Sequence, residues 1–358
     1  MGRHIGRARR ECKAAARPAL TSRGGRWLNV SAGQLPRLLT RTETPPVKPI
    51  VTLTLNPSID GASETDVVRP THKIRTRGDR YDPGGGGINV ARVITALGGS
   101  ALPVYLAGGT TGDVMDELMT ERGLPFRRID ILGHTRISHA VYETSTGLEY
   151  RFNPEGPEVT PGEWLECLEV IDGLDFDWLV ASGSRPRGLP DDCFVTLVHR
   201  AADRGARVVL DSSGPALAAT LAAGGLALVK PSLGELRSLT GTALDTPEAI
   251  AAAAAAIVAA GQADMVAVTM GHEGALLASA GGTAFELPPQ VPVKSATGAG
   301  DSFVGAMTLA LAEGRAPAEA FLRGMAAGSA TVMHPGTDLC RLEDVNRLHA
   351  ELVGRGRP

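Results

Sequence analysis

The chain has 358 residues, of which 43% are hydrophobic and 21% charged, as expected for a globular protein of one large or two medium domains. No apolar run reaches the ~18 residues that cross a bilayer, so we expect no membrane-spanning helix. The four cysteines are scattered without a C-x-x-C pair, which argues against a zinc site or a disulfide framework and favours a cytoplasmic location.

The net charge of −3 hides an asymmetry along the chain. Residues 1–48 hold nine Arg and two Lys against Glu11 and Glu43, so this part carries +9 and the remainder carries −12. Residues 1–46 lack both a sustained periodicity and the apolar core of a secretory signal. We expect a disordered basic extension, translated from upstream of a true start near Val47, with a transit peptide or a nucleic-acid-binding tail as alternatives.

The first half of the chain alternates apolar runs with glycine-rich turns. Residues 49–55 predict a buried strand, and the charged, alternating residues 65–77 predict an exposed strand pair. Four consecutive glycines, Gly84 to Gly87, open the next predicted helix. The remaining elements predicted here are a helix over 88–97, a strand over 103–106, a helix over 113–122, and a hairpin of 137–142 with 149–152.

The second half is more regular. Apolar strands are predicted at 178–181, 208–210, 227–229 and 265–269, and helical stretches separate them. The clearest helix, 247–260, has Thr246 as N-cap and Pro247 at its first position. This alternation predicts an α/β fold with a mostly parallel sheet and helices on both faces. Each strand ends in a polar or glycine-rich turn, and ligands of such sheets bind at those carboxyl ends.

The turn from Gly298 to Asp301 is the most informative segment. Its small residues can direct several N–H groups at one anion, and a helix predicted over 302–313 follows directly. A carboxylate beside such an anion site supplies the proton acceptor that phosphoryl transfer to a hydroxyl needs. The alternative is that Asp301 only caps the helix.

Three other groups of residues have both a functional and a plain structural interpretation. The glycine quartet is either a flexible linker or a place where a ligand approaches the backbone, with Asn89 beside it to bond hydroxyls. Asp60 is either a turn carboxylate or an acceptor for a polyol hydroxyl. Lys73, Arg75 and Arg136 are either solvated surface cations or ligands of a sugar phosphate, and Lys230 with Glu235 is either a surface pair or part of a site.

Two common nucleotide motifs are missing from the sequence. The chain has no G-x-x-x-x-G-K-[ST] phosphate loop, and the glycine quartet does not complete G-x-G-x-x-G, because Asn89 stands at the sixth position. A dinucleotide-binding domain is therefore disfavoured.

Taken together, these segments resemble the ribokinase-like sugar kinases, the PfkB family. The resemblance runs from about Val47 to the C-terminus and rests on motifs that occur in the family's order: Asn56-Pro57-Ser58-Ile59-Asp60, Gly84-Gly85-Gly86-Gly87-Ile88-Asn89-Val90-Ala91-Arg92, Asp211-Ser212-Ser213-Gly214, Lys230-Pro231 with Glu235, and Gly298-Ala299-Gly300-Asp301. Within the family, Gly87, Pro83 and Tyr150-Arg151-Phe152 point to the minor type of bacterial 6-phosphofructokinase. Asn56 is shared with 1-phosphofructokinases and tagatose-6-phosphate kinases, which stay open as alternatives.

The resemblance implies one kinase domain over 47–358 with a small β-sheet lid at about 59–79 and 133–152. In the family, two such lids often pack together, so a homodimer through the lid is expected. The implied activity is ATP-dependent phosphorylation of a sugar phosphate, fructose 6-phosphate above all, in glycolysis. A catalytically silent sugar or nucleotide sensor on the same fold is the alternative of another class, and binding of nucleic acid is not expected.

The resemblance also implies a role for each site residue. Asp301 is the implied general base, and Gly298, Ala299 and Gly300 complete the anion hole. The implied sugar-phosphate ligands are Asp60, Lys73, Arg75, Gly84, Gly85, Asn89, Arg136 and Ser184. The implied ATP contacts are Lys230, Ser232, Thr269, Gly271 and Gly274. Glu235 is implied to organise Mg²⁺ through water, and a K⁺ site is implied near Ser295, Thr297, Thr331, His334 and Gly336.

Three features depart from the family pattern. Ser232 stands where Asn is usual, which puts the metal or phosphate contact there in doubt. Arg185 and Arg187 interrupt the usual Gly-Ser-Leu-Pro-Pro-Gly turn and add positive charge near the expected sugar-phosphate region. His334 and Asp338 alter the loop that is expected to bind K⁺.

Overall fold

The computed structural model describes residues 48–355. These residues belong to one compact unit. The disordered extension predicted over residues 1–46 lies outside the described residues. In the part that is described, no helix is both long and apolar enough to cross a membrane.

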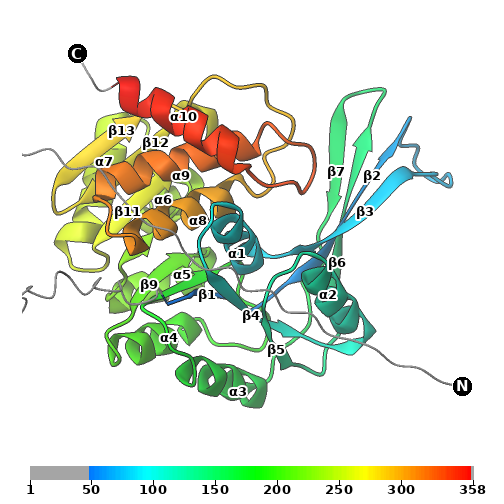
Figure 1. The fold of residues 1–358 in the computed structure, drawn as a ribbon, viewed down its shortest axis with the longest axis horizontal. Helices are drawn as coiled ribbons and strands as arrows, with labels where there is room; N and C mark the ends of the chain where they lie inside the picture. The colour runs from blue at the N-terminus through cyan, green and yellow to red at the C-terminus, as the bar shows by residue number, and fades with distance from the viewer. Residues whose placement is uncertain (1–47, 356–358) are drawn as a thin grey trace, which may run out of the picture. The chain divides into compact units, whose positions relative to one another are not determined.

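A nine-stranded sheet forms the centre of the fold (Figure 1). Its strands are, in spatial order, β13 (Gly282–Glu286), β12 (Ala275–Ser279), β11 (Met265–Thr269), β10 (Leu228–Val229), β9 (Arg207–Asp211), β8 (Trp178–Ser182), β1 (Ile50–Thr54), β4 (Ala101–Ala107) and β5 (Arg127–Asp130). Pairing is parallel from β11 to β5, and only β12 and β13 add antiparallel strands. The predicted mostly parallel sheet is confirmed.

Helices cover both faces of this sheet, as predicted. One face packs against α3 (Pro161–Asp172), α4 (Cys193–Ala202), α5 (Gly214–Ala223), α6 (Leu233–Thr240) and α7 (Pro247–Ala259). The other packs against α1 (Gly86–Ala96), α8 (Ala299–Ala312), α9 (Pro317–Thr331) and α10 (Leu342–Arg355). Figure 1 shows α3 and α4 on the opposite side of the strands from α8 to α10. Because both faces are covered, a strand such as β8 is buried along its whole length and has a nearly continuous apolar sequence.

A second sheet of four strands stands beside the central one and forms the lid. Its order is β3 (Arg77–Gly84), β2 (Ser58–Thr65), β6 (Arg136–Glu143) and β7 (Leu148–Phe152). The strand pair predicted over 65–77 is wrong. That segment is mainly the connection between β2 and β3, because its charged, exposed residues have no apolar face to bury and include Pro70.

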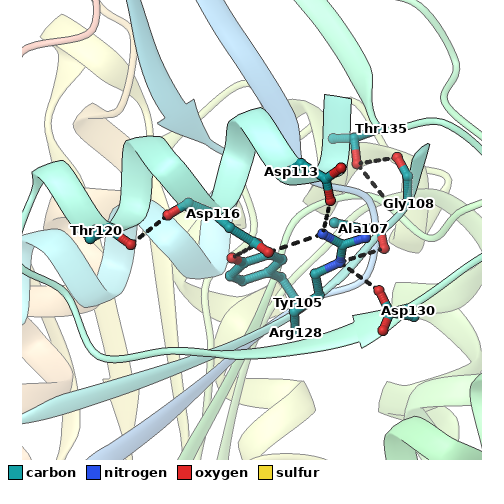
Figure 2. A network of polar contacts seen from close by, with 9 residues as sticks. All are labelled: Tyr105, Ala107, Gly108, Asp113, Asp116, Thr120, Arg128, Asp130 and Thr135. Carbon is teal, nitrogen blue, oxygen red and sulfur yellow. Dashed lines mark hydrogen bonds and ion pairs between the residues drawn. The ribbon is translucent and has the colours of Figure 1, made fainter. Parts of the chain in front are cut away.

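An ion-pair network fixes the edge of the central sheet next to the lid (Figure 2). Arg128 on β5 reaches α2 (Gly109–Glu121), where it pairs with Asp113 Oδ1 at 2.9 Å and Asp116 Oδ2 at 3.0 Å. Tyr105 on β4 donates its hydroxyl to Asp116 Oδ1 at 2.6 Å, and burial together with this carboxylate raises the pKa of Tyr105. Thr135, immediately before β6, accepts a hydrogen bond from the Gly108 N–H at 3.1 Å. The residue that precedes the outer lid hairpin of β6 and β7 is therefore anchored to the start of α2.

Candidate active site

The carboxyl ends of the central strands and the inner face of the lid enclose a polar cavity of about 360 Å³. The strand ends contribute Ser182, Ser184 and Asp211, and the lid contributes Asp60 and Arg136. Further lining residues are Ser58, Gly85, Gly86, Asn89, Ser138, His139, Glu149, Arg151, Asn153, Glu235, Thr297, Asp301, Gly336 and Thr337. The cavity lies where parallel α/β sheets bind their ligands.

Asp301 lies in the first turn of α8, which begins three residues earlier than predicted. Gly298 is the N-cap, in the left-handed conformation with φ 75°, so Asp301 is not the capping residue. A Cβ atom at position 298 would lie 2.6 Å from Leu339 Cδ2, which is a second reason for glycine there. The helix therefore starts with exposed N–H groups that no capping side chain of its own occupies.

The carboxylate of Asp301 faces the cavity and accepts a hydrogen bond from Asn89 Nδ2 at 2.9 Å. Burial raises the pKa of Asp301 to about 7, and the nearby carboxylate of Asp211 contributes to the rise, while Asn89 and Lys230 oppose it. A carboxylate with a pKa near the working pH suits a general base.

Lys230 follows β10 directly and is buried in a pair with Asp211 at 3.0 Å. Burial alone would lower the pKa of Lys230, but the adjacent Asp211 outweighs it and raises the pKa, so the ammonium stays charged. Its Nζ lies 3.6 Å from where a Cβ atom on Gly300 would stand. A buried positive charge thus adjoins the N-terminal turn of α8.

The glycine quartet is packed tightly, so the flexible-linker interpretation is wrong. A Cβ atom on Gly84 would lie 2.0 Å from Asp60 Oδ2, and one on Gly86 would lie 2.2 Å from Ser182 Oγ. Gly85 has φ 111°, which a residue with a side chain rarely adopts. Gly86 and Gly87 are already the first turn of α1, so the helix starts before residue 88, where it was predicted.

Asp60 lies on lid strand β2, paired with β3, and is not a turn residue. Ser58 Oγ donates to its Oδ1 at 2.5 Å, and burial raises the pKa of Asp60. The cavity thus has Asp60 on the lid side and Asp301 on the helix side.

The three candidate cations for the sugar phosphate lie in different places. Arg136 lines the cavity, but its guanidinium also donates to three backbone carbonyls, of Asn56 at 3.0 Å, Pro57 at 3.3 Å and Pro154 at 2.9 Å. Lys73 and Arg75 are exposed in the β2–β3 connection and do not line the cavity within residues 48–355. Strand β2 separates them from Ser58 at its base, and the seven steps from Ser58 to Thr65 span about 23 Å at ~3.3 Å per residue.

A second cavity, of about 550 Å³ and largely apolar, lies on the other side of the same turn. Three of the expected ATP contacts, Thr269, Gly271 and Gly274, line it. The other lining residues are His272, Ala275, Pro288, Pro289, Gln290, Val291, Val293, Ala296, Ala299, Gly300, Phe303, Met325, Gly328, Ser329 and Val332. Gly271, in a 3₁₀ turn over Gly271–Glu273, has φ 59°, and a Cβ atom on Gly274 would lie 2.5 Å from Glu286 O.

The N-terminus of α8 therefore separates two cavities of different character. Thr297 and Asp301 face the polar cavity, while Ala299 and Gly300 face the apolar one. An anion held by this turn would lie between a polar ligand and an apolar one, which is the arrangement needed for group transfer between them.

Ser232 and Glu235 form a capping box at the start of α6. Glu235 Oε2 accepts from the Ser232 N–H at 2.7 Å and from Ser232 Oγ at 2.9 Å, while the Glu235 side chain also lines the polar cavity. The serine that replaces the family's Asn thus has a helix-capping function of its own.

The five residues expected at a K⁺ site lie around the loop after α9. Thr331 donates its hydroxyl to Ser302 Oγ at 2.6 Å, and the Thr297 N–H donates to Ser295 Oγ at 3.2 Å. Gly336 lines the polar cavity, and His334 Nε2 lies 3.5 Å from Asp344 Oδ2. Among residues 48–355, no cluster of three His, Cys, Asp or Glu side chains could hold a metal ion. A monovalent site here would depend on hydroxyl and carbonyl oxygens instead.

The two arginines that depart from the family turn are held by the protein itself. Arg185 pairs with Asp191 at 2.9 Å, and Arg187 donates to Gly156 O at 3.1 Å. Neither lines the polar cavity, so the positive charge expected near the sugar phosphate is not found on the cavity wall.

Sequence reasoning missed several residues of the polar cavity. Ser138, His139 and Arg151 line it from β6 and β7. Asn56 does not line it but donates to the lining residue Ser184, at Oγ, at 3.2 Å and to Glu155 O at 2.9 Å. Strand alternation could have placed Ser138 and Arg151 on the face that carries Asp60, but only with the order of the lid strands known.

Comparison with known proteins supports this geometry. The family model for pfkB family carbohydrate kinases matches residues 53–344. The chain belongs to this family. It is therefore an enzyme of the carbohydrate kinase class, which transfers phosphate to a hydroxyl group of a sugar or sugar phosphate.

Among curated relatives of this kinase, the ATP-dependent 6-phosphofructokinase isozyme 2 of Escherichia coli is 40% identical over 85% of this chain and 98% of its own length. The isozyme 2 of Mycobacterium tuberculosis is also 40% identical, over 83% of this chain and 88% of its own. A 1-phosphofructokinase of Xanthomonas campestris is more distant, at 33% identity over 85% of this chain and 94% of its own.

Solved structures of relatives show the same fold as this kinase. The phosphofructokinase-2 of Escherichia coli in complex with potassium matches with a TM-score of 0.83 and 39% identity, covering 86% of this chain and 100% of that one. The same enzyme in complex with fructose-6-phosphate matches with a TM-score of 0.81 and 38% identity, at the same coverage. The ribokinase-like fold is thereby confirmed.

Proposed function

We propose that this kinase transfers the γ-phosphoryl group of ATP to fructose 6-phosphate, which yields fructose 1,6-bisphosphate. The observation that carries the proposal is the position of Asp301 and its helix turn between a polar cavity and an apolar one. The polar cavity suits a sugar phosphate, and the apolar cavity suits an adenine ring.

The proposed reaction needs two contributions from the turn. Asp301 takes the proton of the sugar hydroxyl as that oxygen bonds to the γ-phosphorus and the bond to the ADP oxygen breaks. The N–H groups from Gly298 to Asp301 hold the charge on the transferred group. General-base action is worth ~10²–10⁴-fold, and one anion-hole donor is worth ~10²–10³-fold in acyl-transfer enzymes.

We assign the sugar side to Asp60, Asn89 and Ser184 with the backbone at Gly84 and Gly85. Asp60 lines the cavity from the lid and Ser184 lines it from the end of β8. Gly85 lines the cavity directly, whereas Gly84 is buried against Asp60. Arg136 and the lid arginine Arg151 are the cations of this cavity suited to the phosphate already on the sugar.

On the nucleotide side, we assign Lys230 to the phosphates of ATP, because its ammonium adjoins Gly300. Thr269, Gly271 and Gly274 would contact the nucleoside. The unpaired oxygen of Glu235 would hold Mg²⁺ through water, and Mg²⁺ would neutralise phosphate charge. The K⁺ expected near Ser295, Thr297, Thr331, His334 and Gly336 would steady the same turn electrostatically, and the potassium complex of the Escherichia coli relative supports it.

The preference for fructose 6-phosphate draws its support from the relatives. The 6-phosphofructokinases are 40% identical to this chain and the 1-phosphofructokinase is 33% identical. The test is ADP release from MgATP over fructose 6-phosphate, fructose 1-phosphate, tagatose 6-phosphate and fructose. We expect the highest kcat/KM with fructose 6-phosphate. A higher kcat/KM with another sugar phosphate would identify that compound as the substrate instead. No turnover with any of the four sugars would favour a non-catalytic sensor.

We also propose that two copies pair through their lids. In the sheet register, Tyr81 and Phe152 share one cross-strand row, and Ile137 and Leu148 lie on the same face. The exposed fractions of these four side chains are 50%, 60%, 45% and 57%. A four-stranded lid with an uncovered apolar face gains by burying it against a second copy. A tetrameric inhibited form of the Escherichia coli relative supports oligomers in this family. The cytoplasm is the proposed location, on the strength of the scattered cysteines.

A further inference from the structure

Arg92 is a buried arginine of α1 that contacts Asn89, one turn earlier on the same helix. Its Nη1 donates to Asn89 Oδ1 at 3.1 Å and to Pro83 O at 3.3 Å. Its Nη2 lies 3.5 Å from Asp82 Oδ1, and 11% of its side chain is exposed. Arg92 does not line the polar cavity, so it cannot act on a ligand there directly.

Asp82 holds this arginine from the lid. It lies on β3, only 1% of its side chain is exposed, and it also contacts Arg122 and the hydroxyl of Thr337. Two arginines and a hydroxyl hold this buried carboxylate in place, and the loss of one arginine still leaves it paired with the other. Asp82 and Arg92 therefore form a rigid support behind Asn89.

The chemistry of the two partners decides which way the Asn89 amide points. An amide has one accepting end and one donating end, and a guanidinium can only donate. With Oδ1 taken by Arg92, the Nδ2 group of Asn89 is the end that faces Asp301, where it donates to Oδ2 at 2.9 Å. In the reversed orientation, the amide oxygen of Asn89 would face the carboxylate of Asp301, and its amide nitrogen would face the guanidinium of Arg92, so neither hydrogen bond could form.

We propose that Arg92, supported by Asp82, is a positioning residue that fixes the Asn89 amide so that it donates to Asp301. The inference rests on the proposed role of Asp301 as general base. It links the lid strand β3 to the reacting carboxylate through three side chains, none of which except Asn89 lines the cavity.

Loss of this support would change Asp301 in a defined direction. The groups that face its carboxylate are Asn89 from α1, Asp211 from β9, Lys230 after β10 and Asp60 from the lid. The Asn89 hydrogen bond stabilises the charged form, so an amide free to turn away would raise the pKa of Asp301 further.

The test compares Arg92→Met and Arg92→Lys with Arg122→Met as the matched control. Arg122 contacts the same Asp82 carboxylate but leads to the C-terminus of α2, away from Asn89. For both Arg92 variants we expect kcat to fall about 10- to 100-fold, the loss typical of a misplaced catalytic group, with KM for ATP within about 2-fold. The acidic limb of the plot of kcat/KM against pH should shift to higher pH. Arg122→Met should match the parent in both kcat and pH profile.

A double mutant separates positioning from a general structural effect. If Arg92 acts through Asn89, adding Arg92→Met to Asn89→Ala lowers kcat no further; an additive loss overturns the inference. Because Arg92→Met alone leaves Asp82 less compensated, Asp82→Asn/Arg92→Met serves where the single variant does not fold. An unchanged kcat and pH profile in the folded variant also overturns it.

A crystal structure of the Arg92→Met protein tests the inference without turnover. We expect Asn89 to leave its contact with Asp301 or to occupy a second rotamer, and a retained 2.9 Å contact would contradict the proposal. If the parent protein phosphorylates no sugar phosphate, the proposed function fails, while this structural comparison still decides the role of Arg92.

Discussion

Lys230 Nζ lies 3.0 Å from Asp211 Oδ1, and the two side chains are only 7% and 14% exposed. The pair joins the ends of two neighbouring strands, β9 and β10, directly beneath the turn that begins α8. A buried positive charge at this place interacts strongly with any anion bound at the turn.

Removing one partner of this pair should destabilise the protein more than removing both. Lys230→Met leaves Asp211 as a buried unpaired carboxylate, which costs about 3–5 kcal/mol in comparable sites. Lys230→Met/Asp211→Asn should lose less, and urea denaturation of the three proteins measures the difference. A double variant less stable than the Lys230 single variant would show that the pair is not coupled in this way. Each Lys230 variant should also show a raised KM for ATP.

Asp301→Asn should fold normally and lose at least ~10²-fold in kcat, on the general-base magnitude. With Asp301 present, kcat/KM should rise with pH up to about 7 and level off above it, since the base must be charged. Steady-state rates between pH 5 and 9 measure both effects. Near-parent turnover in Asp301→Asn would remove this residue from the chemistry.

The same substitution should stabilise the fold at neutral pH. The pKa of Asp301 is about 7 when folded against an ordinary 3.8, so the folded state binds the proton more tightly. The stabilising contribution is therefore complete below about pH 4 and is lost as the pH rises to about 7. We expect the stability of the parent, relative to Asp301→Asn, to fall across this window, at up to ~1.4 kcal/mol per pH unit. A difference that stays flat with pH would contradict the raised pKa.

Gly84→Ala should weaken binding of the sugar phosphate. The added Cβ atom would lie 2.0 Å from Asp60 Oδ2, so the carboxylate must move out of its present place. We expect KM for the sugar phosphate to rise at least tenfold, with KM for ATP little changed. Gly162→Ala in α3 is the control, because its Cβ atom meets only Thr160 Oγ1 at 4.0 Å. Equal KM values for the sugar phosphate in the two variants would show that Asp60 does not contact the substrate.

Val293→Asp should act on the nucleotide alone. Val293 lines the apolar cavity and its side chain is 72% exposed, so the change leaves the core intact. A carboxylate at the rim would repel a triphosphate, and KM for ATP should rise several-fold while the sugar KM stays constant. Leu287→Asp, at an exposed position that does not line this cavity, is the matched control. Equal KM values for ATP in both variants would show that the nucleotide does not bind in this cavity.

Leu148→Asp/Phe152→Asp should prevent pairing of the lids. Both side chains lie on the exposed face of β7, and two charges there cannot be buried against a second copy without a large desolvation cost. Sedimentation velocity should show a dimer for the parent and a monomer for this variant, with Leu165→Asp on α3 as the exposed apolar control. A parent protein that is already monomeric would contradict the lid dimer.

The alternation of strands and helices was predictable because buried parallel strands and capped helices have strong local patterns. The helix over α7 is an example: Thr246 accepts from the Ala249 N–H, and Pro247 occupies the first turn as expected. The strand pair predicted over 65–77 was wrong because an alternation of charged residues does not require a strand when no partner covers either face. The early starts of α1 and α8 were missed because glycines lower helix propensity, although tertiary packing holds them in the helices.

The candidate site was predictable where one short motif carries its residues, as at Gly298 to Asp301. It was not predictable where separate elements meet. Nothing local to Asp82 or Arg92 indicates that one supports the other, and the placement of Arg151 depends on the order of the lid strands. Lys73 and Arg75 were predicted at the site because of their charge, but they do not line the cavity. Their charge pattern does not reveal that the length of β2 separates them from it.

The helix turn with a cavity on either side also constrains how an inhibitor of this kinase can be built. Each cavity has its own lining, and within residues 48–355 only the stretch from Ala296 to Asp301 contributes to both. A single molecule that joins an adenosine to a hexose phosphate through an oligophosphate linker could therefore occupy both cavities at once. Once one half of such a molecule is bound, the other half would be present at a high effective concentration at its own cavity. The linker length that gives the tightest binding would then measure the distance between the two bound ligands.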